Sequence, residues 1–182
     1  MELLKKGAVI AAVRSDEEFR LALLKKTEII FDLNTDLLKI TKRIRLAHEH
    51  GKKLFVHMDF ADGIGKDESG IRFLKSIGID GIISTRQGII KIARKLEIFT
   101  VQRFFIVDSQ SVLTTVESVK AAKPDMIEVM PGIANKVIES LSKSLSVPVI
   151  AGGLVETKDE VLNALKCGAA AVSTGRAELW EI

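Results

Sequence analysis

The residues best suited to bind a small ligand lie near the end of the chain, in two segments of small and hydroxyl-bearing residues. Gly152-Gly153 follows the apolar run Val147–Ala151, and Ser173-Thr174-Gly175 ends the apolar run that begins at Ala170. Small residues let the backbone approach a ligand, and the N–H groups exposed at such strand ends suit phosphate or another anion. Because one strand-plus-helix unit separates the two segments, neighbouring parallel strands would bring them side by side. We therefore predict a phosphate site formed by Gly152, Gly153, Ser173, Thr174 and Gly175.

A second group of polar residues lies where other apolar runs end, and we predict that it completes the pocket. His57 and Asp59 are separated by Met58, so alternation along a strand would place them on one face. There they could perform acid–base chemistry or bind a hydroxyl group. Alternatively, they could hydrogen-bond each other and their neighbours, closing the top of the fold.

Three further residues join this predicted pocket, namely Arg86, Gln102 and Glu128. A basic residue such as Arg86 in the first turn of a helix opposes the helix dipole, which favours an orientation toward an anion. Glu128 has apolar neighbours, so it needs either an internal salt bridge or a ligand hydroxyl group. Gln102 and Arg103 are adjacent and only one can face inward. We include Gln102 in the predicted pocket, although the sequence does not settle whether Gln102 or Arg103 faces the barrel interior.

The elements that must position these residues are eight short apolar runs that alternate with segments of helical spacing. Such alternation predicts a parallel sheet, and eight units predict a closed (β/α)8 barrel formed as a single domain by residues 1–182. Active sites of such barrels lie at the carboxyl ends of the strands. The expected strands are Gly7–Val13, Glu28–Leu33, Lys53–Phe60, Gly81–Ser84, Phe99–Phe105, Met126–Met130, Val147–Ala151 and Ala170–Ser173.

Helix boundaries are indicated by capping residues. Ser15 with Glu18 and Thr157 with Glu160 are typical of capping boxes, and Thr85 and Ser109 are candidate caps of two further helices. Helix ends are expected at Gly51 and Gly168, because glycine permits a left-handed turn.

The last helix of the barrel is expected to be truncated, since only eight residues follow Thr174. Leu179 and Trp180 are the only large apolar side chains before the terminal isoleucine of that segment. We expect them either to pack against the first helix or to help form a homodimer.

Composition narrows the class of protein. The formal net charge of +3 is too mild to predict nucleic-acid binding. A single cysteine, Cys167, excludes an internal disulfide and is consistent with a reducing, cytoplasmic location. No ligand-spaced His/Cys set indicates a metal, and no cofactor is expected. Residues 1–6 lack the apolar run of a signal peptide, and no apolar run is long enough to cross a membrane.

The sequence has few residues placed to catalyse a reaction, and we assign no catalytic residue. No predicted strand ends in a lysine placed to form a Schiff base. The Asp-x-Lys pattern of decarboxylase barrels that act on phosphorylated substrates is missing, because Phe60 and Ala61 follow Asp59. An enzyme of this fold, a lyase or isomerase acting on a small phosphorylated substrate, stays as the alternative to a binding protein.

The motifs resemble one family, the glycerol uptake operon antiterminator regulatory proteins. The resemblance extends over nearly the whole chain, through Val56-His-Met-Asp59, Gly81-Ile-Ile-Ser-Thr-Arg86, Ile127-Glu-Val-Met-Pro-Gly132, Val149-Ile-Ala-Gly-Gly153 and Ala171-Val-Ser-Thr174. It implies a transcription regulator that binds glycerol 3-phosphate and then a messenger RNA leader, preventing premature termination. Carried onto this chain, it implies that Gly152, Gly153, Ser173 and Thr174 hold the phosphate. His57, Asp59, Arg86 and Glu128 would contact the glycerol end or complete the pocket.

An RNA-binding surface is harder to find in the sequence. Basic residues cluster in two predicted helices, at Lys39, Lys42, Arg43 and Arg45 and at Lys91, Arg94 and Lys95. A solvated helix face is the ordinary explanation of either cluster. If RNA binds, phosphate contacts should dominate and affinity should fall steeply with salt.

Overall fold

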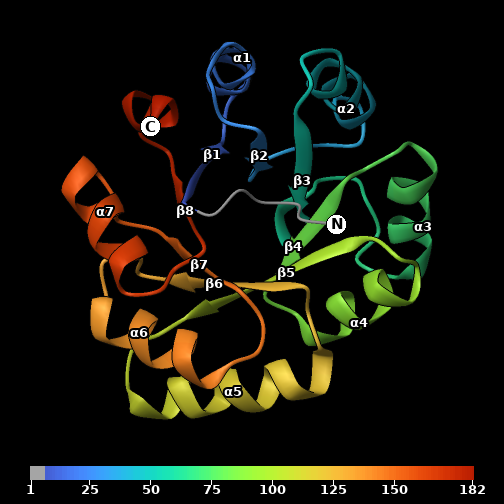
Figure 1. The fold of residues 1–182 in the computed structure, drawn as a ribbon. Helices are drawn as coiled ribbons and strands as arrows, with labels where there is room; N and C mark the ends of the chain where they lie inside the picture. The colour runs from blue at the N-terminus through green and yellow to red at the C-terminus, as the bar shows by residue number, and fades with distance from the viewer. Residues whose placement is uncertain (1–6) are drawn as a thin grey trace.

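The computed structural model describes residues 7–182, in which eight parallel strands close into a barrel with the helices outside it (Figure 1). The strands follow one another in chain order and β8 pairs with β1, which confirms the predicted (β/α)8 barrel. Residues 1–6, where we expect no signal peptide, lie outside the described residues. The strands are β1 Ala8–Val13, β2 Ile29–Asp32, β3 Lys53–His57, β4 Gly81–Ser84, β5 Phe99–Phe105, β6 Met126–Met130, β7 Val149–Gly152 and β8 Ala171–Thr174.

Among the described residues, seven α-helices and one short 3-10 helix connect the strands, and a second 3-10 helix follows the last strand. The α-helices are α1 Asp16–Leu24, α2 Ile40–Glu49, α3 Glu68–Ser76, α4 Gln87–Lys95, α5 Ser109–Ala122, α6 Asn135–Ser144 and α7 Lys158–Lys166. The 3-10 helices are η1 Met58–Phe60, directly after β3, and η2 Ala177–Glu181, after β8.

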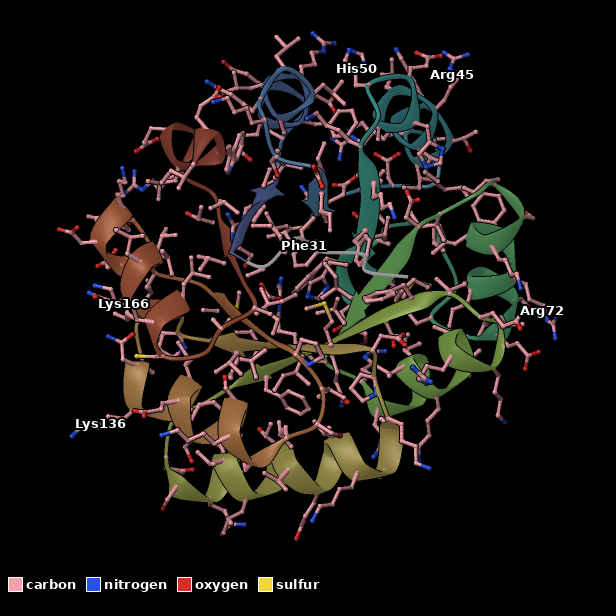
Figure 2. All side chains as sticks on the ribbon, in the orientation of Figure 1. Phe31, Arg45, His50, Arg72, Lys136 and Lys166 are labelled. Atoms are coloured by element: carbon pink, nitrogen blue, oxygen red, sulfur yellow. The ribbon has the colours of Figure 1, made fainter. Side chains whose placement is uncertain are left out.

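The core has two layers, because successive strand residues point alternately into the barrel and toward the helices. Inside the barrel, the rings of Phe31 and Phe55 stack with centroids 5.6 Å apart, among aliphatic residues such as Ile10 and Ile150. Figure 2 shows Phe31 near the centre of the ring of strands, whereas Arg45 and Lys136 lie at the periphery. The barrel is therefore filled by apolar side chains at its centre.

The predicted capping boxes of α1 and α7 are both present, with Ser15 and Thr157 as the caps. Gly51 and Gly168 have positive φ angles of 68° and 99°, as expected where helices end. The other two cap predictions are wrong. Asp108, rather than Ser109, caps α5, and the residue before α4 is Arg86, which makes no capping hydrogen bond.

The truncated last helix is confirmed as η2, which lies between α7 and α1 (Figure 1). Trp180 is fully buried, and its Nε1–H donates to the Thr174 carbonyl at 2.8 Å. Lys25, after α1, pairs with Glu181 at 2.9 Å, and η2 contacts α1 and β1. The expectation that Leu179 and Trp180 pack against the first helix is thus confirmed. Trp180 leaves no surface exposed for a homodimer contact.

In residues 7–182, none of the helices has the length and apolar character required to cross a membrane.

Candidate functional site

A pocket of about 280 Å³ opens at the carboxyl ends of the strands, between β8, β1 and β5 to β7. Pockets for drug-sized ligands measure about 300–1,000 Å³, so this one suits a smaller molecule. Three arginines and two glutamates give its lining a positive balance. The lining residues are Ala12, Arg14, Leu33, Arg103, Glu128, Met130, Gly153, Leu154, Val155, Glu156, Ser173, Thr174, Gly175 and Arg176.

Glu128 is the buried centre of a polar network on the floor of this pocket. Its Oε2 accepts a hydrogen bond from Arg103 Nε at 2.5 Å, and its Oε1 accepts one from Ser173 Oγ at 2.5 Å. Glu128 is fully buried, and Arg103 and Ser173 are almost so. The internal salt bridge, one of the two alternatives for Glu128, is therefore present.

The same contacts settle which of two adjacent residues faces inward. Arg103 lies inside the barrel, whereas Gln102 Nε2 donates to Ser118 Oγ of α5 at 2.9 Å. The prediction that Gln102 lines the pocket is wrong, because alternation along β5 turns it toward the helices once Arg103 faces Glu128.

Arg103 retains an unused donor at the pocket. Its Nη2 is buried and has no hydrogen-bond partner among the described residues. Buried polar groups in folded proteins are nearly always hydrogen-bonded, so an unpartnered guanidinium nitrogen beside a cavity indicates a place for an acceptor. A ligand oxygen, and above all an anionic one, would satisfy it.

Four of the five residues predicted to bind phosphate line the pocket, and the fifth, Gly152, has a different role. Gly153, Ser173, Thr174 and Gly175 line the pocket, and Gly153 has a φ of 76°, which favours glycine. Gly152 does not line it. A Cβ at Gly152 would lie 2.6 Å from Ser173 Oγ and even closer to Glu128 Oε1. Its missing side chain therefore makes room for the Glu128–Ser173 hydrogen bond.

We expect Gly152→Ala to reduce the free energy of unfolding by about 1–3 kcal/mol, the usual cost of overpacking. Urea unfolding followed by circular dichroism measures this loss. The matched control is Gly88→Ala in α4, where a Cβ meets nothing within 4 Å and alanine should stabilise by about 0.5–1 kcal/mol. Equal effects of the two substitutions would contradict the role given to Gly152.

Thr174 uses its side chain within the protein. Its hydroxyl donates to the Val155 carbonyl at 2.7 Å, and its oxygen accepts from the Arg176 amide at 3.1 Å. Arg176 in turn pairs with Glu156 at 2.6 Å at the pocket edge. Thr174 therefore orders the loops after β7 and β8.

His57 and Asp59 do not share a strand face, so that prediction is wrong. β3 ends at His57, and η1 turns Asp59 toward the end of β4. Asp59 Oδ1 accepts from Ser84 Oγ at 2.7 Å, and its Oδ2 accepts from the Thr85 amide and hydroxyl, both at 2.8 Å. Burial alone would raise the pKa of Asp59, but these hydrogen bonds outweigh it and lower the pKa.

Arg86 lies beside Asp59 at the rim, with its Nε 3.8 Å from Asp59 Oδ1, and it is 59% exposed. Neither Asp59 nor Arg86 lines the pocket. The structure thus places these two predicted pocket residues together at the β3–β4 rim, away from the predicted phosphate residues.

His57 is buried inside the barrel, with its ring centroid 4.9 Å from that of Phe60, and it does not line the pocket. Neither ring nitrogen has a partner among the described residues. Burial, reinforced by the charge of Arg103, lowers the pKa of His57 to about 4. The imidazole is therefore neutral at pH 7. Because the folded pKa is depressed, its contribution to stability is present above the ordinary pKa of 6.5 and is lost as pH falls toward 4.

Besides Arg103, three charged residues of the pocket were not among the predicted site residues, namely Arg14, Glu156 and Arg176. Arg14 follows β1, and its Nη1 lies 3.4 Å from the position of a Cβ on Gly175. All three lie beyond strand ends, where alternation no longer indicates direction. No group of three or more potential metal ligands occurs within the described part of the chain.

The fold and this pocket define a (β/α)8 barrel with a small, arginine-lined cavity at the carboxyl ends of its strands. The family model of glycerol-3-phosphate responsive antiterminators matches residues 9–180. The chain belongs to this family, which confirms the resemblance found in its motifs.

Solved structures and a curated relative agree with this assignment. The glycerol uptake operon antiterminator regulatory protein of Listeria monocytogenes is 33% identical, with a TM-score of 0.90 over 95% of this chain and 94% of that chain. A glycerol uptake operon antiterminator-related protein of Thermotoga maritima is 34% identical, with a TM-score of 0.87 over 97% and 99%. The uncharacterized protein YgcP of Escherichia coli is 34% identical over 183 residues, covering 100% of this chain and 96% of that protein.

Proposed function

We propose that this chain is a cytoplasmic transcription antitermination regulator that binds glycerol 3-phosphate in the pocket and then a messenger RNA leader. The phosphate would lie against Gly153, Ser173 and Gly175, with Arg14 and Arg176 at the open side. The unpartnered Nη2 of Arg103 would donate to an oxygen of the ligand.

The observation that carries this proposal is the buried, unused Arg103 donor on the floor of a pocket that has more arginines than glutamates. A phosphorylated three-carbon ligand supplies what such a pocket needs, because it carries an anion at one end and hydroxyl groups at the other.

We further propose that the pocket binds its ligand without transforming it. Both carboxylate oxygens of Glu128 and of Asp59 accept hydrogen bonds from protein donors. His57 does not line the pocket. Neither carboxylate is free to act as a general base, which must be within hydrogen-bond reach of the proton that it abstracts. Turnover of triose or pentose phosphates that is lost in Asp59→Asn would instead favour the enzyme.

Titration with glycerol 3-phosphate, followed by melting temperature, tests the proposal. At a hundred times Kd a ligand stabilises the folded state by about 2.7 kcal/mol. For a chain of this length that raises Tm by roughly 5–10 °C. Glycerol and inorganic phosphate, each tested alone, should shift Tm less. An intact fold with no shift at millimolar glycerol 3-phosphate would contradict the proposal.

A pair of arginine substitutions locates the ligand. Arg14→Gln should weaken glycerol 3-phosphate binding about tenfold or more, since a hydrogen bond to a charged group contributes about 1.5–3 kcal/mol. The control is Arg72→Gln in α3, an exposed arginine that pairs with Glu68 and does not line the pocket. It should leave affinity unchanged, and calorimetry measures both variants.

A further inference from the structure

The exposed aromatic side chains of this protein lie at one end of the barrel. Of nine aromatic residues, Phe60 and Phe105 are the two that are exposed, at 62% and 59%. Residues 1–6 contain no aromatic residue, so this holds for the whole chain. Phe60 ends η1 after β3, and Phe105 is the last residue of β5. Both therefore lie at the carboxyl ends of the strands, where the pocket opens.

A cation follows the strand between the two strands at whose ends these rings lie. β4 is the strand between β3 and β5, and Arg86 follows it with 59% of its side chain exposed. We call Phe60, Arg86 and Phe105 the mouth arc. Lys66, on the same loop as Phe60, adds a second cation at this rim and donates to the Ala61 carbonyl.

Exposed aromatic rings next to arginine match the chemistry of single-stranded nucleic acid. Unpaired bases stack on aromatic side chains, and each stacked base contributes about 1–3 kcal/mol. Arginine adds contacts to phosphate and to base faces. Two solvent-exposed phenylalanine rings at the rim contribute neither to the packed core nor to binding of a small polar ligand.

The basic helix faces predicted from the sequence are poorer candidates because they lack an exposed aromatic surface. Four of their seven basic residues also pair with acidic neighbours, although Arg86 likewise lies 3.8 Å from Asp59. Arg43 is buried and pairs with Asp32, and Arg94 pairs with Asp125. Lys39 pairs with Asp36 at 3.2 Å, and Arg45 pairs with Glu49 at 3.6 Å. Neither helix carries an exposed aromatic residue.

We propose that the mouth arc is the RNA-contacting surface, on which unpaired bases of single-stranded RNA stack against Phe60 and Phe105 while Arg86 contacts phosphate. This inference rests on the proposed antitermination function and adds to it the location and the mode of RNA binding.

The position of the arc connects RNA binding with the effector pocket. Phe105 follows Arg103 by two residues along β5, and the next amide, of Ile106, donates to the Met130 carbonyl at 2.7 Å. Arg103 and Met130 both line the pocket. A ligand bound to Arg103 would contact the ends of β5 and β6, which together position Phe105. A shift of these strand ends on ligand binding would change the affinity of the mouth arc for RNA.

The test measures fluorescence anisotropy of a labelled pool of random 15-nucleotide single-stranded RNAs at low salt, with saturating glycerol 3-phosphate. Phe60→Leu/Phe105→Leu keeps apolar side chains but removes the stacking surface, and it should weaken binding at least tenfold. Because both rings are largely exposed, this variant should fold, and its melting temperature should fall only by what the contact between the Phe60 and His57 rings contributes. Arg86→Gln should weaken binding more than Lys91→Gln, which removes one exposed cation from the face of α4.

Each outcome decides the inference. If the wild-type protein binds the pool and the double leucine variant binds equally well, the arc is not the RNA surface. If the wild-type protein does not bind the pool, the inference fails, and a glycerol 3-phosphate shift in Tm would show that the effector part of the proposed function survives. Light scattering tests whether a second copy of the chain, rather than RNA, binds the mouth arc. A wild-type dimer that becomes a monomer in Phe60→Ala/Phe105→Ala would assign the arc to a second copy of the chain and overturn the inference.

Discussion

Glu128→Ala is expected to lower the free energy of unfolding by about 3–5 kcal/mol, the range found when one partner of a buried ion pair is removed. The substitution leaves the Arg103 guanidinium, 6% exposed, without its carboxylate, and it leaves the Ser173 hydroxyl without its acceptor. A small domain has a total stability of only about 5–15 kcal/mol, so a loss of this size approaches unfolding. Urea unfolding at pH 7, followed by circular dichroism, measures it.

The double variant Arg103→Met/Glu128→Leu provides the control for this prediction. Replacing both members of a buried ion pair by apolar residues is often neutral or stabilising. The double variant should therefore recover most of the stability lost in Glu128→Ala. Since it also removes the unpartnered Nη2 donor, it should bind glycerol 3-phosphate far more weakly than the wild-type protein. A Glu128→Ala protein within 1 kcal/mol of wild type would contradict the buried-pair interpretation.

The closed barrel could be predicted from the sequence because its signals are local and repeated eight times. Each strand is a short apolar run, and the capping boxes at Ser15 and Thr157 form from residues three positions apart. Such contacts depend on neighbouring residues alone. The short last helix was predictable from length, since only eight residues follow Thr174, and η2 takes up five of them.

The inward or outward direction of individual side chains was less predictable. Gln102 and Arg103 are both polar, so composition alone does not decide which faces the barrel interior. The decision comes from Glu128, 25 residues away, whose buried charge requires Arg103. A long-range electrostatic requirement thus fixes the orientation of β5.

Asp59 shows a second limit of sequence patterns. Alternation would place it with His57, but the strand stops at His57, and the donors of Ser84 and Thr85 hold Asp59 at the end of the neighbouring strand. Thr85 does not cap α4 because the helix begins only at Gln87, with Arg86 at the N-cap position, so Thr85 lies one residue too early. The position of Asp59 depends on hydrogen bonds between two loops that no single strand pattern encodes.

A second large effect is expected outside the barrel, where Arg43 of α2 neutralises Asp32. Arg43 Nη1 donates to Asp32 Oδ1 at 2.6 Å, its Nη2 pairs with Asp16, and its guanidinium lies 5.1 Å from the Phe19 ring centre. Asp32 is fully buried, and burial raises the pKa of its carboxyl group although Arg43 acts in the opposite direction. Arg43→Met keeps an unbranched side chain over Phe19 but leaves this carboxyl group without its cation.

We expect Arg43→Met to cost about 3–5 kcal/mol of unfolding free energy at pH 7.5, where a buried unpaired carboxylate is most unfavourable. The cost should shrink as pH falls. An acid with a raised folded-state pKa binds more protons when folded than when unfolded, so stability is greatest near and below the ordinary value of 3.8 and is lost as pH rises. Urea unfolding of variant and wild type at pH 5 and 7.5 measures the difference.

The variant Arg43→Met/Asp32→Asn separates charge from packing in this prediction. Asparagine has nearly the shape of aspartate but carries no charge, so the double variant should recover stability at pH 7.5 and show no extra dependence on pH relative to wild type. If the cost of Arg43→Met were the same at pH 5 and pH 7.5, the loss would come from packing against Phe19 and not from the carboxyl group. Lowered salt should leave the result unchanged, because the pair is buried and screened much less than exposed charges are.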